Sequence, residues 1–283
     1  MTIGGIPIHP PLVSAALSAI LLAVLFSSRV AVKGTTLNAP LNWAMLSATL
    51  FLLASFITNG ASSIPANLRN SAIWYAVICS TFTPLMAVLG AKRPQNHGWQ
   101  WVVFTLWLIL IWPALQALAL PVGPRLELFG AWKLFLMVLV GLGLLNYLPT
   151  RHFPAAALMA TGQCVLLAEQ WDSAWDSPWR ISIGLGCLLA AALTVFLRRE
   201  PVLGDDSLDQ RSQRWLHFRN AFGAFWGLRI LQRVNETAVL RDWTVHLTWF
   251  GFESVSSSQT RRPTESQLAE IDHTLDTLLR RFF

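Results

Sequence analysis

Long apolar stretches dominate the first two thirds of the chain, and polar or charged positions dominate the rest. Crossing about 30 Å of hydrocarbon takes roughly 20 apolar residues in a helix. Stretches that meet or approach this length cover residues 11–28, 41–59, 72–91, 99–120, 128–148, 153–170 and 179–197. A lone strand in lipid would leave its backbone groups unpaired, so each stretch is expected to be an α-helix. The pattern predicts an all-α polytopic membrane protein with a seven-helix transmembrane bundle over residues 1–198.

Residues 199–283 are predicted to form a small, mostly helical cytosolic region. Residues 207–241 have the pattern of one long helix with Ser207 as its N-cap. Its large aromatic side chains share about a third of the helix circumference, and these are Trp215, Phe218, Phe222, Phe225 and Trp226. Such a stripe favours either the core of a small domain or a helix lying at a membrane interface, with its arginines reaching phosphates.

Two further elements follow that helix. Residues 243–249, WTVHLTW, alternate strictly between apolar and polar, which predicts a β-strand. A single strand is not stable alone, so it must pair with an unrecognised segment, a second copy or a partner. Thr264 and Gln267 form a capping box before a helix with apolar residues at heptad spacing, namely Leu268, Ile271, Leu275, Leu278 and Phe282.

Composition agrees with a membrane protein. Hydrophobic residues make up 54% of the chain and charged residues 13%, whereas soluble domains carry about 25% charged residues. The net charge of +6 arises mostly in short loops between apolar stretches, where orientation explains it, so nucleic acid is not an expected partner. With the N-terminus outside and the C-terminus in the cytoplasm, the inner loops carry more basic residues than the outer ones. The inner set is Arg29, Lys33, Lys92, Arg93, Arg151, Arg198 and Arg199, and the outer set is Arg69, Arg125 and Arg180.

Candidate chemistry within the apolar stretches is sparse. Pro84 and Pro113 are expected to kink their helices or to open local backbone sites. Lys133 and Glu169 are the charged residues inside apolar stretches; they are expected either to form an ion pair or to snorkel separately. The histidines and cysteines have no metal-ligand spacing, so no catalytic or metal-binding residues are predicted.

The outer loop EQWDSAWDSPWR, residues 169–180, concentrates tryptophan and aspartate. It is similar to the Trp-rich WWD segment of haem-handling cytochrome c maturation proteins, over about a dozen residues. Its spacing departs from that pattern, and the paired outer histidines of that family are missing, with His9 alone on this side. The resemblance implies haem as an alternative cofactor, with Trp171, Asp172, Trp175, Asp176 and Trp179 as the binding residues; otherwise they form an interfacial aromatic belt.

The cytosolic region carries the other candidate site. Trp215, Phe222, Trp226, Arg229 and Arg233 could bind a protein partner or lipid, with Arg229 in reach of cation–π contact with the preceding rings. The first hypothesis is therefore a non-enzymatic integral membrane protein, a scaffold, assembly or regulatory subunit that binds a partner or self-associates through residues 207–283. The alternatives are a haem-handling or redox component and, with Pro84 and Pro113 in its favour, a permease.

The orientation can be tested by cysteine labelling. Cysteines placed at positions 33 and 265 should react with a membrane-impermeant maleimide only after the cells are permeabilised, because both positions are predicted to be cytoplasmic. Labelling of either position in intact cells of a plasma-membrane host would contradict the predicted topology.

Overall fold

The computed structural model describes residues 2–3, 6–7, 10–58, 66–120, 123, 125–171, 177–197, 207–254 and 263–283. The chain divides into two compact units. The first unit is Met1–Leu144 with Pro154–Arg198, and the second is Leu145–Phe153 with Arg199–Phe283. The second unit therefore contains the predicted cytosolic region and, in addition, the connection between two of the hydrophobic stretches.

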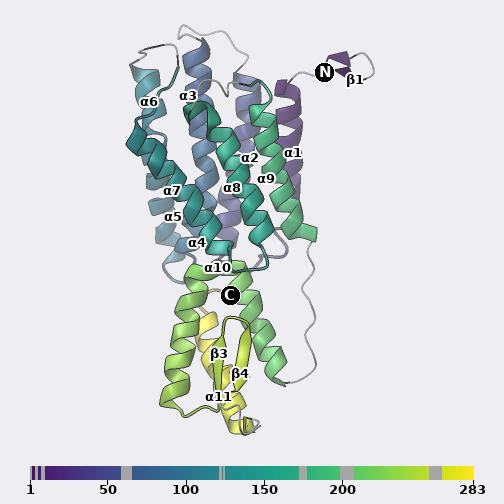
Figure 1. Ribbon diagram of the computed structural model, residues 1–283, viewed down its shortest axis with the longest axis vertical. Coiled ribbons are helices and arrows are strands. Elements are labelled where there is room, and N and C mark those ends of the chain that lie inside the picture. Colours follow the sequence, from purple (N-terminus) through teal and green to yellow (C-terminus); the bar gives the residue numbers. More distant parts are fainter. Residues whose placement is uncertain are drawn as a thin grey trace. The chain divides into compact units, whose positions relative to one another are not determined.

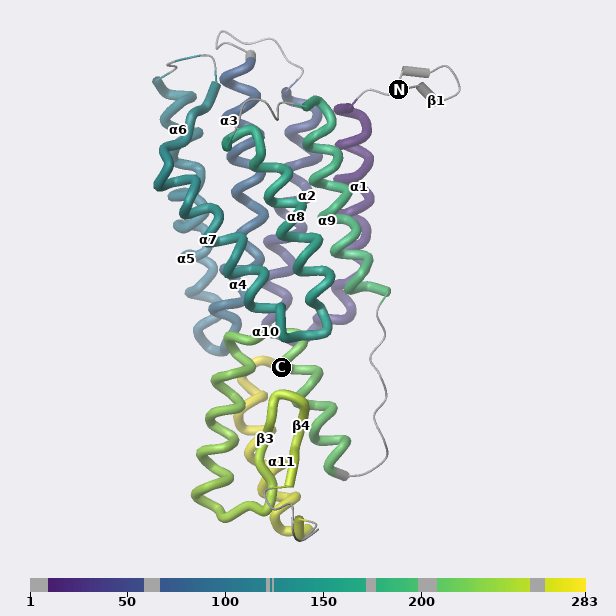
Figure 2. The backbone as a smooth tube through the Cα atoms, viewed as in Figure 1, coloured from purple at the N-terminus to yellow at the C-terminus, as the bar shows by residue number. Residues whose placement is uncertain are grey.

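The first unit is helical, and its long helices run alongside one another (Figures 1 and 2). Helix α1 packs against α2 and α9, α2 packs against α4, and α3 packs against α6. A short ladder of β1 (Thr2–Ile3) with β2 (Ile6–Pro7) precedes α1. The helices are α1 (Pro10–Ser27), α2 (Asn38–Ile57), α3 (Ala66–Cys79), η1 (Ser80–Phe82), α4 (Thr83–Leu89), α5 (Asn96–Leu110), α6 (Trp112–Ala119), α7 (Gly130–Tyr147), α8 (Phe153–Trp171) and α9 (Arg180–Leu197).

Candidate membrane spans are fewer than predicted. Among the described residues, five helices are long and apolar enough to cross a bilayer, or six if the bent pair α5 and α6 forms one span. The five are Pro10–Ser27, Asn38–Ile57, Asn67–Leu89, Gly130–Tyr147 and Arg180–Leu197. The predicted span 153–170 is helical in α8 but is not among the candidates, since Gln163, Glu169 and Gln170 make it more polar. The protein is thus a multi-pass membrane protein with five or six candidate spans, and the seven-helix count is not confirmed.

Both prolines interrupt their helices, as predicted. Pro84 lies in the first turn of α4, directly after the 3₁₀ turn η1, and Pro113 lies in the first turn of α6. Helices α5 and α6 meet at 49°. Proline lacks a backbone N–H and clashes with the preceding turn, which frees carbonyl groups on that turn. Those carbonyl groups need hydrogen-bond donors from other elements.

Helices α8 and α9 approach closely at two glycines. A Cβ atom on Gly162 would lie 3.1 Å from the carbonyl oxygen of Gly184, and one on Gly184 would lie 2.5 Å from Cγ of Leu166. Small residues at such crossings let helix backbones approach each other within lipid. This contact explains how the polar helix α8 is held in the unit, with Gln163, Leu166 and Gln170 all buried.

The second unit is built on a helical hairpin. Helix α10 (Ser207–Leu240) is broken at Gly223, which has φ 79° and ψ −172°. Residues 207–222 and 224–240 consequently form two helices that run in opposite directions (Figure 1). The predicted single helix is therefore wrong at this point. A left-handed φ is accessible to glycine because it has no Cβ.

Four of the five aromatic side chains of the predicted stripe lie in the core of this unit, and the fifth, Phe225, is 39% exposed. Trp215, Phe218 and Phe222 are fully buried, and Trp226 is 6% exposed. Phe282 joins them, with its ring centroid 4.9 Å from Phe218 and 5.1 Å from Trp226. Of the two uses predicted for the stripe, the structure has the domain core. The other buried side chains include Ile230, Val234, Trp243, Val245, Leu247, Phe252, Ile271, Leu275 and Leu279.

The predicted strand is present as β3 (Val245–Thr248), and its partner is the next segment of the same chain, β4 (Gly251–Ser254). The two are antiparallel, with Leu247 opposite Phe252. On the other side of β3, the side-chain amide of Asn235 both donates to and accepts from the backbone of Leu247, each at 2.8 Å. Helix α11 (Glu265–Leu279) begins with the predicted capping box of Thr264 and Gln267.

The turn at Gly223 generates a prediction. Replacing Gly223 with Ala should destabilise the second unit by about 1–3 kcal/mol, because a non-glycine residue is strained at this φ. In addition, its Cβ would lie 2.7 Å from Cγ of Asn146. Thermal unfolding of the detergent-solubilised protein, followed by tryptophan emission, measures the effect. Gly186→Ala is the matched control because a Cβ atom at that position would have no neighbour within 4 Å, and equal melting temperatures for the two variants would contradict the prediction.

Candidate functional site

The break in α10 is held by the connection between α7 and α8, within the second unit. The backbone N–H of Phe225, at the start of the second half of α10, donates to Oδ1 of Asn146 at 3.0 Å. Asn146 therefore satisfies one of the unpaired N–H groups of a helix start, the role that an N-cap residue usually has. Tyr147 donates its hydroxyl to the carbonyl oxygen of Ala221 at 3.3 Å. Both contacts fix the apex of the hairpin on the last turn of α7.

A second set of contacts completes this joint. The indole N–H of Trp249, which follows β3, donates to the carbonyl oxygen of Pro149 at 2.7 Å. The guanidinium of Arg219 lies 5.1 Å from the centroid of the Trp249 ring and donates to its carbonyl oxygen at 2.6 Å. Arg219 also donates to Oδ1 of Asn220 at 2.9 Å. We call Asn146, Pro149, Arg219, Asn220 and Trp249 the apex joint.

Arg219 is a buried cation in this joint. Its side chain is 7% exposed, and burial lowers the pKa of its guanidinium. An arginine pKa is so high that the group nonetheless stays charged at neutral pH. Its charge is compensated by carbonyl and amide oxygens and by the face of an indole ring, interactions that stabilise a cation once water is excluded. This arrangement rigidifies the joint and does not place a reactive group there.

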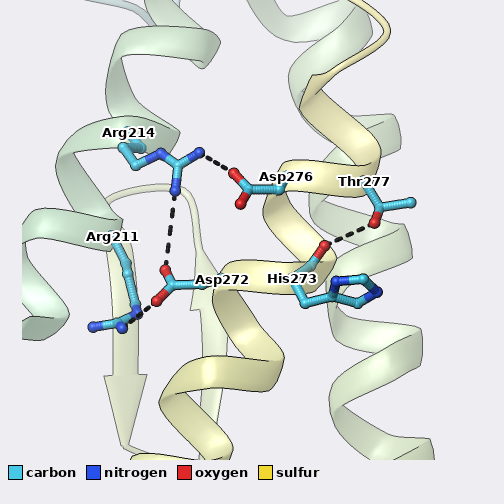
Figure 3. Close-up of polar contacts among 6 residues, drawn as sticks. All are labelled: Arg211, Arg214, Asp272, His273, Asp276 and Thr277. Atoms are coloured by element: carbon cyan, nitrogen blue, oxygen red, sulfur yellow. Dashed lines mark hydrogen bonds and ion pairs between the residues drawn. The ribbon is translucent and has the colours of Figure 1, made fainter.

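Charged side chains connect the first half of α10 to α11 (Figure 3). Arg211 forms an ion pair with Asp272, and Arg214 forms one with Asp276 while lying 4.0 Å from Asp272. Beside these pairs, α11 is stabilised by a bond of its own, from the Thr277 hydroxyl to the His273 carbonyl oxygen at 2.8 Å. The Arg214 and Asp276 side chains are 46% and 62% exposed, so solvent screens their attraction.

An open cavity of about 610 Å³ lies beside these ion pairs, lined by Gln213, Arg214, His217, Asp276, Leu279, Arg280 and Phe283. The His217 and Phe283 rings are stacked with centroids 6.3 Å apart. Its lining mixes basic, acidic and apolar groups, and Arg214 is already paired with Asp276. The cavity therefore has no strong preference for a ligand of one charge.

The predicted partner- or lipid-binding residues separate into two groups. Trp215, Phe222 and Trp226 are core residues of the second unit and do not offer a surface. Arg229 and Arg233 are exposed on the second half of α10. Arg229 lies 4.5 Å from the Phe225 ring centroid and 5.3 Å from that of Trp226, the contact predicted from their spacing. Arg233 forms a 3.1 Å ion pair with Glu236.

The predicted haem-binding residues are described only in part. Trp171 ends α8 and packs, half-buried, against the core of the first unit. Trp179 is half-buried and directly precedes α9. Its backbone N–H donates to the Ser177 hydroxyl at 3.3 Å. Asp172, Trp175 and Asp176 lie outside the described residues. Haem binding by this loop stays a prediction.

Polar side chains gather at the two helix interruptions of the first unit. The Ser80 carbonyl oxygen, which precedes Pro84, accepts from the hydroxyls of Ser47 and Thr83, each at 2.7 Å. The amide N–H₂ of Gln163 donates to the Thr81 hydroxyl at 3.1 Å. All of these side chains are buried. The interruption before α4 thus gathers neutral hydrogen-bonding groups from α2 and α8.

A second such group lies where α5 meets α6. The Leu110 carbonyl oxygen, at the end of α5, accepts from the Tyr75 hydroxyl at 3.0 Å, and Cys79 Sγ lies 3.7 Å from the same oxygen. The Trp132 indole N–H in turn donates to the Tyr75 hydroxyl at 2.6 Å. In lipid a carbonyl group at the end of a helix needs such a partner. The bend is therefore built into the packing of α3, α5 and α7.

Glu169 forms an ion pair in the first unit, but not with Lys133, the partner that one of the two predicted alternatives gave it. Glu169, at the end of α8, forms an ion pair with Arg180, at the start of α9, and Arg180 also donates to the Leu166 carbonyl oxygen. The two side chains are 12% and 7% exposed. The predicted ion pair between Glu169 and Lys133 is therefore wrong, because Glu169 pairs with Arg180, which the sequence had placed in an outer loop. Burial makes this ion pair depend on both partners being present.

Metal-ion chemistry has no evident site in the described ranges. They contain no group of three or more His, Cys, Asp or Glu side chains placed to hold a metal ion. Cys79, Cys164 and Cys187 are free thiols. What the described residues do provide is a set of structural polar contacts, at the helix interruptions and in the apex joint.

Sequence reasoning missed the apex joint. Asn146 lies 79 residues from Phe225 and Pro149 lies 100 residues from Trp249, and no local pattern connects residues at such separations. One available signal was Gly223, because an isolated glycine inside a helical pattern suggests a break or a close approach. A second was the polar pair Arg219–Asn220 on a helix otherwise lined with aromatics.

The two kinds of ion pair should respond differently to the loss of one partner. Arg180→Gln leaves the buried Glu169 carboxylate unpaired and should lower the free energy of unfolding by about 3–5 kcal/mol. Arg214→Gln breaks an exposed pair and should cost about 1 kcal/mol or less. Unfolding in mixed micelles with increasing denaturing detergent measures both.

The double variant Arg180→Met/Glu169→Leu controls for packing. It should be more stable than Arg180→Gln, because no buried charge is left without a partner. A double variant no more stable than the single one, or equal losses for Arg180→Gln and Arg214→Gln, would contradict the assignment of a buried pair.

Comparison of this chain with protein-family models, with curated proteins and with solved structures finds no match.

Proposed function

We propose that this protein is a non-enzymatic multi-pass membrane protein, a scaffold, assembly or regulatory subunit, whose C-terminal unit docks a cytoplasmic protein partner. The observation that carries the proposal is that residues 207–283 form a folded unit together with the α7–α8 connection. A partner bound to this unit would be held, through Asn146 and Tyr147, on the end of a candidate membrane span. That is the property a membrane scaffold needs.

The far end of α10 offers the docking surface. Val239 and Leu240, adjacent large apolar side chains at the end of the helix, are 78% and 82% exposed, and a protein partner would gain from burying them. Arg233, Glu236 and Arg241, within seven residues of them along the chain, carry exposed charge. Apolar groups within a charged rim have the composition of a transient protein interface.

Orientation completes the proposal. If α8 crosses the bilayer in addition to the six candidate spans, the excess of basic residues in alternate loops favours a cytoplasmic C-terminal unit. The partner is then a cytoplasmic protein, or the cytoplasmic part of another membrane protein. A second copy of this chain is the other outcome that the experiment below distinguishes.

The docking surface can be tested in the full-length protein. Val239→Asp/Leu240→Asp should abolish recovery of a stoichiometric partner when the protein is purified in mild detergent, because charge placed in an apolar contact opposes its desolvation. Phe250→Asp, at another residue that is 78% exposed, is the matched control and should leave the partner bound. Mass spectrometry identifies the partner, and light scattering of the purified protein detects self-association.

Two outcomes would reject the proposal. One is a monodisperse monomer without a partner under conditions that preserve membrane complexes. The other is a partner that survives both the Val239→Asp/Leu240→Asp change and removal of residues 207–283. A dimer lost in the double variant would assign the surface to self-association.

A permease is the second candidate, and the interrupted helices favour it. Broken spans that expose backbone carbonyls near the middle of the bilayer form substrate sites in many transporters. Here the groups at the α3–α4 interruption are neutral, namely Ser47, Thr81, Thr83 and Gln163, so a substrate would be a neutral polar solute. Solute uptake into vesicles that is lost with Gln163→Leu would support this candidate.

A further inference from the structure

We propose that Phe225, Leu228 and Arg229 form a binding site for the headgroup of an anionic phospholipid. We call these three residues the headgroup corner. This site goes beyond the proposed scaffold function, because its ligand is a lipid and the docking surface for protein lies at the other end of the same helix.

The depth of the corner follows from contacts within the second unit. Helix α7 is a candidate span of 18 residues, about 27 Å long at 1.5 Å per residue. Because this nearly equals the hydrocarbon thickness, its last residues must lie at a membrane surface. Asn146 is in that last turn and accepts a 3.0 Å hydrogen bond from the Phe225 N–H. Phe225 therefore also lies at the membrane surface.

Arg229 cannot be far from the same level. It follows Phe225 by four residues, which is about 6 Å along the helix axis whatever the direction of the helix. The polar headgroup layer is about 5–7 Å thick on each side of the hydrocarbon. The Arg229 side chain is long enough to reach phosphate groups from either end of that range. The depth of Arg229 is thus set by the hydrogen bond to Asn146 and by the length of α7.

The chemistry of the corner suits an anionic headgroup. Phe225 and Leu228 are 39% and 57% exposed, and an exposed ring beside an aliphatic side chain is typical of residues at the acyl–headgroup boundary. Arg229 is exposed and lies over the Phe225 ring, which orients its guanidinium. A guanidinium can donate two parallel hydrogen bonds to one phosphate.

Charge pairing distinguishes Arg229 from its neighbours. No described acidic residue forms an ion pair with Arg229, whereas Arg233 pairs with Glu236 and Arg241 with Glu270. Among the described residues of the second half of α10, Arg229 is thus the arginine whose charge can pair with an external anion. The α7–α8 connection adds the exposed apolar side chains of Leu148 and Phe153. Both are consistent with lipid contact around the corner.

Lipid retention tests the site in the full-length protein. We would purify it from membranes in mild detergent, exchange it into nanodiscs with equal phosphatidylglycerol and phosphatidylcholine, and count bound lipids by native mass spectrometry. Wild-type protein should retain phosphatidylglycerol in preference, and Arg229→Gln should reduce that retention about five-fold, the effect of one basic residue at a charged membrane surface. Arg229→Lys keeps the charge and should retain more than Arg229→Gln.

Arg241→Gln is the matched control, since it removes the same charge about 18 Å further along the helix, where Arg241 already has a carboxylate partner. It should retain lipid as wild-type protein does. Equal retention of the two lipids by wild-type protein, or undiminished phosphatidylglycerol on folded Arg229→Gln, would overturn the proposal. Loss of a protein partner in Arg229→Gln with unchanged lipid retention would also overturn it and assign the corner to a protein. Should Arg229→Gln fail to fold, the wild-type preference and the Phe225→Ala variant, expected to retain less phosphatidylglycerol, decide.

Discussion

The need to pair every backbone polar group that leaves regular structure governs both units. Where Pro84 interrupts a helix, the hydroxyl groups of Ser47 and Thr83 donate to the released Ser80 carbonyl oxygen, and near Pro113 the Tyr75 hydroxyl donates to the Leu110 carbonyl oxygen at the end of α5. Where Gly223 breaks α10, Asn146 accepts a hydrogen bond from one of the unpaired N–H groups at the start of the new helix, that of Phe225. An unpaired backbone group costs several kcal/mol in lipid and somewhat less in a protein core. Each interruption is therefore tolerated only because another element supplies a polar side chain.

The same logic explains how the two buried arginines differ. Arg180 lies in a candidate span and is paired with a carboxylate, Glu169. Arg219 belongs to the second unit and is held by neutral oxygens and an indole ring. In both cases the stability of the fold depends on the partners of the buried cation, because removing them would leave an uncompensated charge.

Much of the local structure could be predicted from the sequence. Apolar length predicts helices, alternation predicts β3, and the Thr264–Gln267 pair predicts the start of α11, since each pattern records interactions among near neighbours. Partners distant in the sequence could not be predicted. The Asn146–Phe225 bond and the Glu169–Arg180 pair depend on which segments meet in three dimensions. The number of spans could be predicted only in part. Helix α8 is long enough to cross a bilayer, but it carries buried Gln163 and Gln170.

The candidate site residues show the same difference between local patterns and long-range contacts. Helical periodicity grouped Trp215, Phe222 and Trp226, and all three are buried, although Trp226 lies beyond the break at Gly223 on the second helix. A shared helix face describes a core and a binding surface equally well. Only packing against Phe282 and the hairpin distinguishes them. For the exposed residues Phe225, Leu228 and Arg229, the sequence gives no depth in the membrane. The hydrogen bond from Phe225 to Asn146 supplies it.

The apex joint has a consequence for biosynthesis. Asn146 is synthesised 79 residues before its partner Phe225, and Pro149 is synthesised 100 residues before its partner Trp249. During that interval the side chain of Asn146 and the carbonyl group of Pro149 lack these partners. The apex contacts can consequently form only after the chain has been synthesised through Trp249, so this joint is completed later in translation than α7 itself.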